Sequence, residues 1–289
     1  GEGNVPAYRG MAYVVLEDLD LGPFGNRMPQ FSFEVFRPAE RTDPAEAEDI
    51  AQLVNGVCLI PGTGEYAMAE QPVYLSETYG QQVPVNLNSP GGQTDMVASL
   101  TALTEELPAC RSVVMVVSWF GDDLRAGSCT IRPKVEQSDV ESDAMPWRVS
   151  GLTREAALAV PQIDGRPIYG GTTADAAVIE GIRAIRDRGL DVVYYPFILM
   201  DQVDGNGLPD PWTGETGQAP LPWRGRITTS LAPGLSGSPD GTSAAEAEVA
   251  AFFGTASAGD FNLDGDRIDY TGPEEWSKRR FILHQAHLC

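Results

Sequence analysis

Two nearly continuous apolar runs restrict the fold of this chain more than any other feature. They occupy residues 112–120 (SVVMVVSWF) and 191–200 (DVVYYPFILM). A strand that is apolar on both faces needs cover on both sides, as strands have in a parallel sheet flanked by helices. The stretch between the runs carries apolar residues at helical spacing, which are Val178, Ile179, Ile182 and Ile185. Gly189 then stands where a helix C-cap belongs, so the pattern predicts a βαβ unit and an α/β fold.

Further elements of the same kind surround these runs. One helical face is predicted by Met96, Leu100, Leu103 and Leu107. A short strand is predicted at 166–169, followed by a helix that opens at Thr172 and Thr173. At most three parallel strands are therefore expected, at 112–120, 166–169 and 191–200. We expect the front part of a (β/α)8 TIM-barrel-like domain or of a doubly wound sheet.

The N-terminal part of the chain predicts a different structure. Alternating apolar and polar residues predict strands at 12–16 and 30–37. Asp43 followed by Pro44 is typical of a helix start, and this short helix is expected to reach about residue 54. Residues 56–90 are irregular and rich in Gly, Pro, Gln and Thr, which is typical of a connector.

The predicted organisation has three parts. A β-rich segment spans residues 1–42, a connector spans 43–90, and the first part of a TIM-barrel-like domain, truncated at its C-terminus, spans 91–289. Within the last part we also expect a helix at 243–253 capped by Gly254, a hairpin near 263–270 and a final helix at 273–289.

Charge and composition exclude several function classes. The chain has 20 Lys and Arg against 41 Asp and Glu, for a formal net charge of −21. Nucleic-acid binding needs clustered cations, which the sequence lacks. No apolar run approaches the roughly 20 residues of a membrane-spanning helix. The four cysteines have no CxxC spacing and predict small buried side chains, with a Cys110–Cys129 disulfide as the alternative.

Acidic residues follow both apolar runs, at the positions where α/β folds bind ligands. Asp122 and Asp123 come after the first run, and Asp201 comes after the second. Side chains just past the carboxyl ends of parallel strands meet at one edge of the sheet. Carboxylates there are candidates for contact with sugar hydroxyls, and the alternative is that they cap helices or pair with arginines such as Arg125. Adjacent carboxylates do not form the opposed pair that glycoside hydrolysis needs.

Tryptophans gather in the loops predicted at the same edge. Trp119, Trp212 and Trp223 are candidates for stacking on a sugar ring, and the alternative is that they fill core space, as for Trp147. We expect no catalytic residue within this stretch and no cofactor.

Two further patterns bear on metal binding. Residues 260–266 resemble the start of a calcium loop, but Thr271 stands where a bidentate Glu is wanted, and a hairpin turn at Asp264–Gly265 is the favoured alternative. His284 and His287 lie one helical turn apart without a third ligand in view, so no metal site is predicted.

Several longer segments resemble one family. They are 118–136 (SWFGDDLRAGSCTIRPKVE), 147–149 (WRV), 169–172 (YGGT), 196–201 (PFILMD), 222–227 (PWRGRI), 251–256 (AFFGTA) and 275–289 (EWSKRRFILHQAHLC). They are similar to the TIM-barrel-like, glycoside-hydrolase-like domain of the large baseplate protein of gene transfer agents, the megatron, and of phage tail-tip proteins. Residues 8–35 resemble the tail-hub segment before that domain.

The resemblance implies a virion protein at the tail tip or baseplate of a phage-like particle. It implies a role in attachment to or penetration of the cell envelope and in DNA delivery, after assembly in the bacterial cytoplasm and release from the cell. It also implies hub and distal tail proteins as partners, a homo-oligomeric ring of threefold symmetry, and a cell-surface glycan as a candidate ligand. The alternative is the front half of a glycoside hydrolase acting on cell-wall or capsule glycans.

Overall fold

The computed structural model describes residues 50–62, 64–76, 82–89 and 91–289. The chain divides into two compact units, Gly1–Asp49 and Ile50–Cys289. The strands predicted at 12–16 and 30–37 and the helix start predicted at Asp43 lie outside the described residues. All described residues belong to the second unit.

A four-stranded sheet is the centre of this unit, with a short antiparallel strand at residues 131–132 beside three parallel strands. The parallel strands are β1 (Gly56–Leu59), β4 (Ser112–Gly121) and β12 (Asp191–Met200), in the order β1-β4-β12. β4 and β12 pair over their full length, with Asp191 opposite Ser112 and Met200 opposite Gly121. The two apolar runs are thus confirmed as neighbouring parallel strands.

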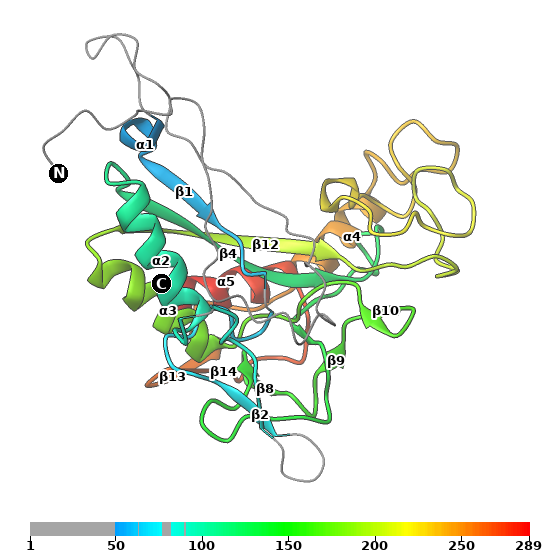
Figure 1. Ribbon diagram of the computed structural model, residues 1–289. Helices are drawn as coiled ribbons and strands as arrows, with labels where there is room; N and C mark the ends of the chain where they lie inside the picture. Colours follow the sequence, from blue (N-terminus) through cyan, green and yellow to red (C-terminus); the bar gives the residue numbers. More distant parts are fainter. Residues whose placement is uncertain (1–49, 63, 77–81, 90) are drawn as a thin grey trace, which may run out of the picture. The chain divides into compact units, whose positions relative to one another are not determined.

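Helices α2 (Asp95–Glu106) and α3 (Asp175–Asp187) connect the three strands. The hydroxyl of Thr94 caps the first of them by accepting a hydrogen bond from the backbone nitrogen of Val97. Gly189 follows α3 with φ = 73°, a left-handed conformation that glycine adopts without strain. Figure 1 shows both helices on the same side of the sheet as α5 (Lys278–Leu288). The fold is therefore mixed α/β with a parallel sheet, and the described residues show no closure of this sheet into a barrel.

Two details of the sheet differ from the sequence prediction. Residues 56–59, assigned to an irregular connector, form the edge strand β1 and pair with residues 112–115 of β4. Residues 166–169, predicted as a parallel strand, are outside this sheet: β11 (Arg166–Pro167) pairs antiparallel with β10 (Gln162–Ile163). The cause is Asp164–Gly165, where φ values of 52° and 74° form the tight turn of a two-residue hairpin.

The remaining elements are short or lie outside the sheet. They are α1 (Ile50–Leu53), β2 (Tyr74–Ser76), β3 (Gln82–Pro84), β5 (Ile131–Arg132), β6 (Lys134–Val135), β7 (Arg148–Val149), β8 (Leu152–Thr153), β9 (Leu158–Ala159), η2 (Arg224–Arg226), α4 (Ser243–Phe253), η3 (Ala258–Asp260), β13 (Phe261–Asp264) and β14 (Arg267–Tyr270). The predicted helix 243–253 and the hairpin near 263–270 are confirmed. The final helix, predicted at 273–289, is present but shorter, at Lys278–Leu288. No helix of the described residues is long and apolar enough to cross a membrane.

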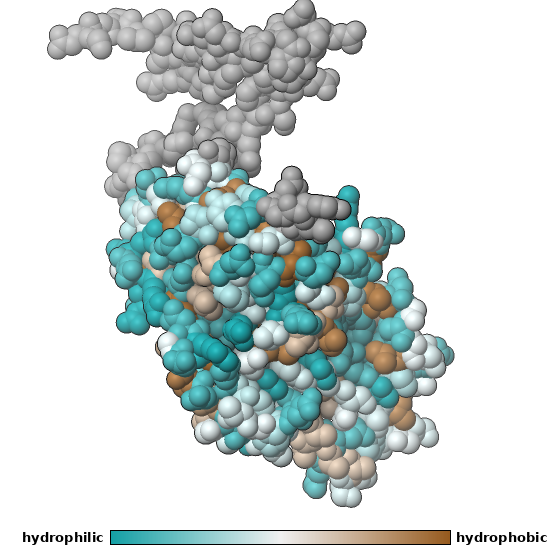
Figure 2. Space-filling view, turned by 90° about the horizontal axis from the view of Figure 1, so that it is seen from below, coloured by the Kyte–Doolittle hydropathy of each residue, from teal (hydrophilic) through white to brown (hydrophobic). Residues whose placement is uncertain are grey.

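The two faces of the sheet have different cover. Val113, Met115 and Val117 of β4 are buried against Val178 and Ile185 of α3. The surface seen from below, on the side of these helices, is mainly hydrophilic with separate hydrophobic residues (Figure 2). We call the opposite side of the sheet the open face, because its β12 side chains Val193 and Tyr195 stay 48% and 41% exposed. Sequence periodicity alone did not predict this one-sided cover, since it treats β12 as buried on both faces.

Candidate functional site

The carboxyl ends of β4 and β12 meet, as the sequence predicted. Gly121 and Met200 are paired residues in neighbouring strands. The backbone nitrogen of Asp201 donates to the carbonyl oxygen of Gly121 at 3.1 Å. Asp122 and Asp201 therefore begin two loops at the same edge of the sheet.

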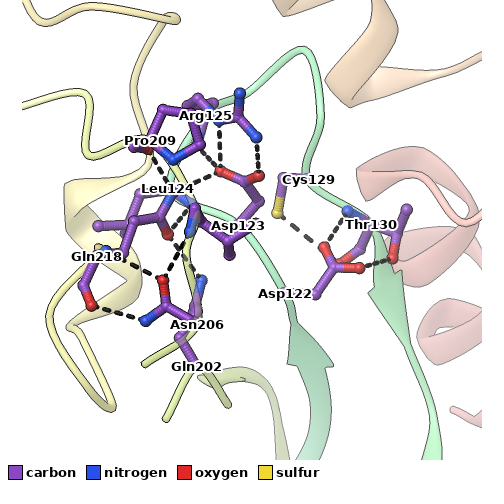
Figure 3. A network of polar contacts seen from close by, with 11 residues as sticks. Asp122, Asp123, Leu124, Arg125, Cys129, Thr130, Gln202, Asn206, Pro209 and Gln218 are labelled. Atoms are coloured by element: carbon purple, nitrogen blue, oxygen red, sulfur yellow. Dashed lines mark hydrogen bonds and ion pairs between the residues drawn. The ribbon is translucent and has the colours of Figure 1, made fainter. Parts of the chain in front are cut away.

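Asp123 is held by its own loop and by a loop far along the chain (Figure 3). Its carboxylate accepts hydrogen bonds from Nε and Nη2 of Arg125, at 3.0 and 2.6 Å, and from Nε2 of Gln218 at 2.7 Å. Burial raises the pKa of Asp123, but these hydrogen bonds outweigh burial and leave the pKa below its ordinary value. Asp123 thus stays ionised and joins the 121–130 loop to the 201–220 loop.

Asp122 is hydrogen-bonded to the end of the same loop. Its two carboxylate oxygens accept from the backbone nitrogen of Thr130 at 2.7 Å and from the Thr130 hydroxyl at 2.6 Å (Figure 3). These contacts return the chain to β5, which pairs with the end of β4. The role visible for Asp122 is to close this loop.

Asp201 forms a buried ion pair with Lys134. The Lys134 Nζ lies 2.5 Å from Oδ2 of Asp201, and the two side chains are only 9% and 3% exposed. Burial raises the pKa of Asp201, Lys134 lowers it, and the charge of Asp122 raises it again, so that it stays above its ordinary value. The backbone of Lys134 is fixed by Thr172, whose hydroxyl accepts a hydrogen bond from the Lys134 nitrogen.

A second buried ion pair lies away from the strand ends. Arg154 Nη2 is 2.6 Å from Oε2 of Glu65, and Oε1 of the same carboxylate accepts from the backbone nitrogen of Glu136 at 2.7 Å. Burial raises the pKa of Glu65, and Arg154 opposes that effect. The guanidinium of Arg154 also donates to Tyr66 and to the carbonyl of Gln137. The hydrogen bonds of Glu65 and Arg154 thus connect three separate chain segments. We interpret this ion pair as structural.

Two of the tryptophans lie in the core. Trp119 is 0% exposed and packs against Trp276, Phe281 and His284. It therefore offers no face to a sugar in this structure, because residue 119 points to the helix side of β4. Trp147 is also fully buried, and its indole nitrogen donates to the Thr172 carbonyl at 2.8 Å.

A groove of about 330 Å³ runs over the open face of the sheet. Its walls are mainly apolar, and the β12 residues in it include Tyr195, Phe197 and Leu199. Tyr169, Gly170 and the other residues before α3 form one border. Clefts with apolar and aromatic walls and few polar groups are the usual form of a small-molecule site.

Trp223 is 68% exposed and directly precedes Arg224, whose guanidinium lies over the ring of the groove residue Phe197. A Cβ atom placed on Gly225 would come within 2.4 to 2.6 Å of three carbons of the Trp223 ring. The indole therefore rests directly on the Gly225 backbone, a position that leaves its other face to solvent.

Arginines accompany both exposed tryptophans. Arg224 stacks at 3.9 Å from the centre of the Phe197 ring and donates to the Tyr195 hydroxyl at 3.1 Å. Arg226 lies 5.4 Å from the Trp212 ring, and the Trp212 indole donates to the Arg226 carbonyl. Trp212 is 39% exposed. We call Trp212, Trp223, Arg224 and Arg226 the basic-aromatic cluster.

The sequence prediction thus identified part of this cluster and missed the rest. Trp212 and Trp223 were candidates, and the structure leaves both exposed. Arg224, Tyr195 and Phe197 were not candidates, because the contacts that join them connect residues far apart in the chain. The Trp-Arg-Gly-Arg order in residues 223–226 is the one sequence signal that pointed to them.

The described residues also bear on the metal alternatives. Residues 261–264 and 267–270 form an antiparallel hairpin whose turn has Gly265 at φ = 61°. His284 Nε2 lies 2.9 Å from Oδ1 of Asp175 in the core. Among the described residues, no group of three or more His, Cys, Asp or Glu is arranged to hold a metal ion. Their four cysteines are free: Cys110 and Cys129 are buried, as predicted, whereas Cys58 and Cys289 are exposed.

No known protein-family model matches this chain. No curated protein sequence is significantly similar to it.

Proposed function

We propose that this chain is a tail-tip component of a phage-like particle and that it binds a cell-surface glycan through its open face. The basic-aromatic cluster and the apolar groove carry the glycan part of the proposal. An indole that is 68% exposed is ready to stack on a pyranose ring. The resemblance to the megatron segments carries the tail-tip part.

The order of the strands supports a barrel-like architecture. Each strand is added beside the previous one, in the order β1-β4-β12, and α2 and α3 lie on one side (Figure 1). A doubly wound sheet reverses this order after its first strands, whereas a (β/α)8 barrel continues it. The proposal therefore includes a partial TIM-barrel-like domain at residues 91–289, extended by β1 into the predicted connector. The open face is the inner face of this sheet, and it is accessible because the described strands do not close into a barrel.

One observation favours the glycoside hydrolase alternative. Asp201 is a carboxylic acid with a raised pKa at the end of a parallel strand, and Asp122 is close enough to affect it. A raised pKa is typical of a general acid. However, Lys134 contacts Asp201, whose side chain is only 3% exposed, so a sugar oxygen has no access in this arrangement. Glycan binding without cleavage is the better supported function.

The proposed assembly rests on the resemblance alone. A homo-oligomeric ring of threefold symmetry, bound to hub and distal tail proteins in the virion, is the expected setting. Light scattering after size-exclusion chromatography tests the ring, and a stable monomer at micromolar concentration contradicts it.

Binding to purified bacterial envelope glycans, meaning capsule polysaccharide and peptidoglycan, tests the function. We expect Trp223→Ala to lower the affinity about ten-fold or more, as loss of an exposed aromatic anchor does. Tyr74→Ala is the matched control, because Tyr74 is also an exposed aromatic residue, 38% exposed, but lies on β2. Wild-type protein that binds no envelope glycan contradicts the proposal. Release of reducing sugar that Asp201→Asn abolishes favours the hydrolase instead.

A further inference from the structure

Several cations of this acidic chain have no carboxylate partner among the described residues, and two of them lie in the basic-aromatic cluster. The net charge is −21, so carboxylates outnumber cations about two to one. Even so, neither Arg224 nor Arg226 forms an ion pair with any carboxylate of the described residues. By contrast, Arg125, Arg154 and Arg183 each have a carboxylate within 2.8 Å. The two arginines of the cluster thus keep free hydrogen-bond donors.

Aromatic rings hold these free guanidinium groups in place. Arg224 stacks on Phe197. Of its five N–H donors, one is used in the hydrogen bond to the Tyr195 hydroxyl. Arg226 lies over the ring of Trp212. Stacking fixes a guanidinium plane without neutralising its charge. The donors are therefore oriented before any ligand arrives, and this lowers the entropy lost on binding.

A third cation lies close to Arg224. The ammonium group of Lys278, at the first position of α5, is half-buried and lies 5.1 Å from the centre of the Phe281 ring. Burial lowers the pKa of Lys278, and the positive charge of Arg224 lowers it further. Two like charges that repel each other are stabilised when an anion comes between them.

We propose that the basic-aromatic cluster selects acidic glycans, with Arg224 and Arg226 binding the carboxylate of a sugar whose ring stacks on Trp223. This rests on the glycan-binding function proposed above and names its substrate class. The guanidinium group matches a carboxylate in a two-bond geometry that a neutral hydroxymethyl group cannot reproduce.

Calorimetry with oligogalacturonate and with its carboxyl-reduced form tests this proposal. The two probes have the same sugar backbone and differ only in having a carboxylate or a neutral hydroxymethyl group on each sugar. We expect the acidic probe to bind at least about ten-fold more tightly than the neutral one, as two charge-assisted hydrogen bonds provide. We expect Arg224→Gln to lower affinity for the acidic probe about ten-fold and to leave the neutral probe unchanged.

Arg186→Gln is the matched control. Arg186 is exposed, forms no ion pair in the described residues, and lies at the end of α3 near the amino ends of the strands. The change removes the same charge from the chain and is expected to leave both affinities unaltered.

The outcomes separate this proposal from the function on which it rests. Equal binding of both probes, with loss in Trp223→Ala only, overturns the acidic selectivity and leaves glycan binding intact. Binding of neither probe, together with no binding of envelope glycans, overturns both. Equal losses in Arg224→Gln and Arg186→Gln show a general charge effect and also overturn the selectivity. A phosphate polymer such as teichoic acid, if it binds better than oligogalacturonate, overturns the assignment to carboxylate.

Discussion

The strand ends and the open face differ in how their charged side chains are paired. At the strand ends, Asp122, Asp123 and Asp201 all have protein partners within 2.7 Å. On the open face, Arg224 and Arg226 touch rings and hydroxyls but no described carboxylate. A polar group whose hydrogen bonds are used inside the protein contributes to stability, whereas one with free donors in an accessible place is available to a ligand.

This comparison predicts a separation of effects. Substitutions at the strand ends are expected to lower the free energy of unfolding and to change glycan binding little. Substitutions in the basic-aromatic cluster are expected to do the reverse.

Lys134→Met removes the cation of the buried ion pair and is expected to destabilise the protein most. The carboxylate of Asp201, 3% exposed, then stays buried without its partner, which costs about 3–5 kcal/mol. Urea unfolding followed by circular dichroism measures this change. The double variant with Asp201→Leu serves as control and is expected to recover most of the loss. A loss below about 1 kcal/mol for Lys134→Met contradicts a structural role for the pair.

Asp123→Ala is expected to cost about 1–3 kcal/mol, because it leaves Arg125 and Gln218 without their shared acceptor. Glycan affinity is expected to stay within about two-fold of wild type. Asp204→Ala, at an exposed position of the 201–220 loop, is the control for loss of one negative charge. If Asp123→Ala keeps full stability and loses binding, the proposed division between the two regions is wrong.

The pH dependence of stability is expected to have opposite signs at the two carboxylates. The pKa of Asp201 is raised in the folded state, so its contribution is complete below the unfolded value near 3.8 and is lost as pH rises through the folded pKa. The pKa of Asp123 is lowered, so its contribution is present above 3.8 and is lost as pH falls through the folded pKa.

Unfolding measured from acid to neutral pH in Asp201→Asn and Asp123→Asn checks these signs. The stability difference between wild type and Asp201→Asn is expected to shrink as pH rises. The difference for Asp123→Asn is expected to shrink as pH falls. The same sign for both variants contradicts the arrangement of partners at the strand ends.

Gly225→Ala is the most subtle change and acts on the other region. The new methyl group meets the Trp223 ring, which turns away because it is the free end of an exposed side chain. We expect a loss of glycan affinity of about two- to five-fold with stability changed by less than about 0.5 kcal/mol. Gly259→Ala, where a Cβ meets nothing within 4 Å, is the control. Unaltered affinity in Gly225→Ala shows that the orientation of the Trp223 indole does not contribute to glycan binding.

The sequence predicted the elements that have strong periodicity. β4, β12, α2 and α3 are long enough for the apolar pattern to fix both their type and their approximate bounds. β1 was missed because its four residues, GVCL, are too few to show a period. The strand predicted at 166–169 was wrong because a local Asp–Gly turn decided the pairing there.

The candidate site was less predictable for a different reason. Sequence reasoning placed the acidic residues at the strand ends but gave Asp201 no partner, since Lys134 is 67 positions away. The one nearby partner, Arg125, was already an alternative in the sequence. The exposure of the tryptophans could not be predicted from the sequence either. Trp119 is buried because it packs against α5, whereas Trp223 lies on the Gly225 backbone and stays exposed.

Glycan affinity measured side by side for Trp223→Ala and Asp122→Asn tests the central claim most directly. Both residues were predicted to contact a sugar, but only the Trp223 indole is mostly exposed and forms no hydrogen bond with the described residues. The account predicts about a ten-fold loss or more for Trp223→Ala and wild-type affinity for Asp122→Asn. Wild-type affinity in Trp223→Ala together with lost binding in Asp122→Asn contradicts it, because the ligand site then lies at the strand ends.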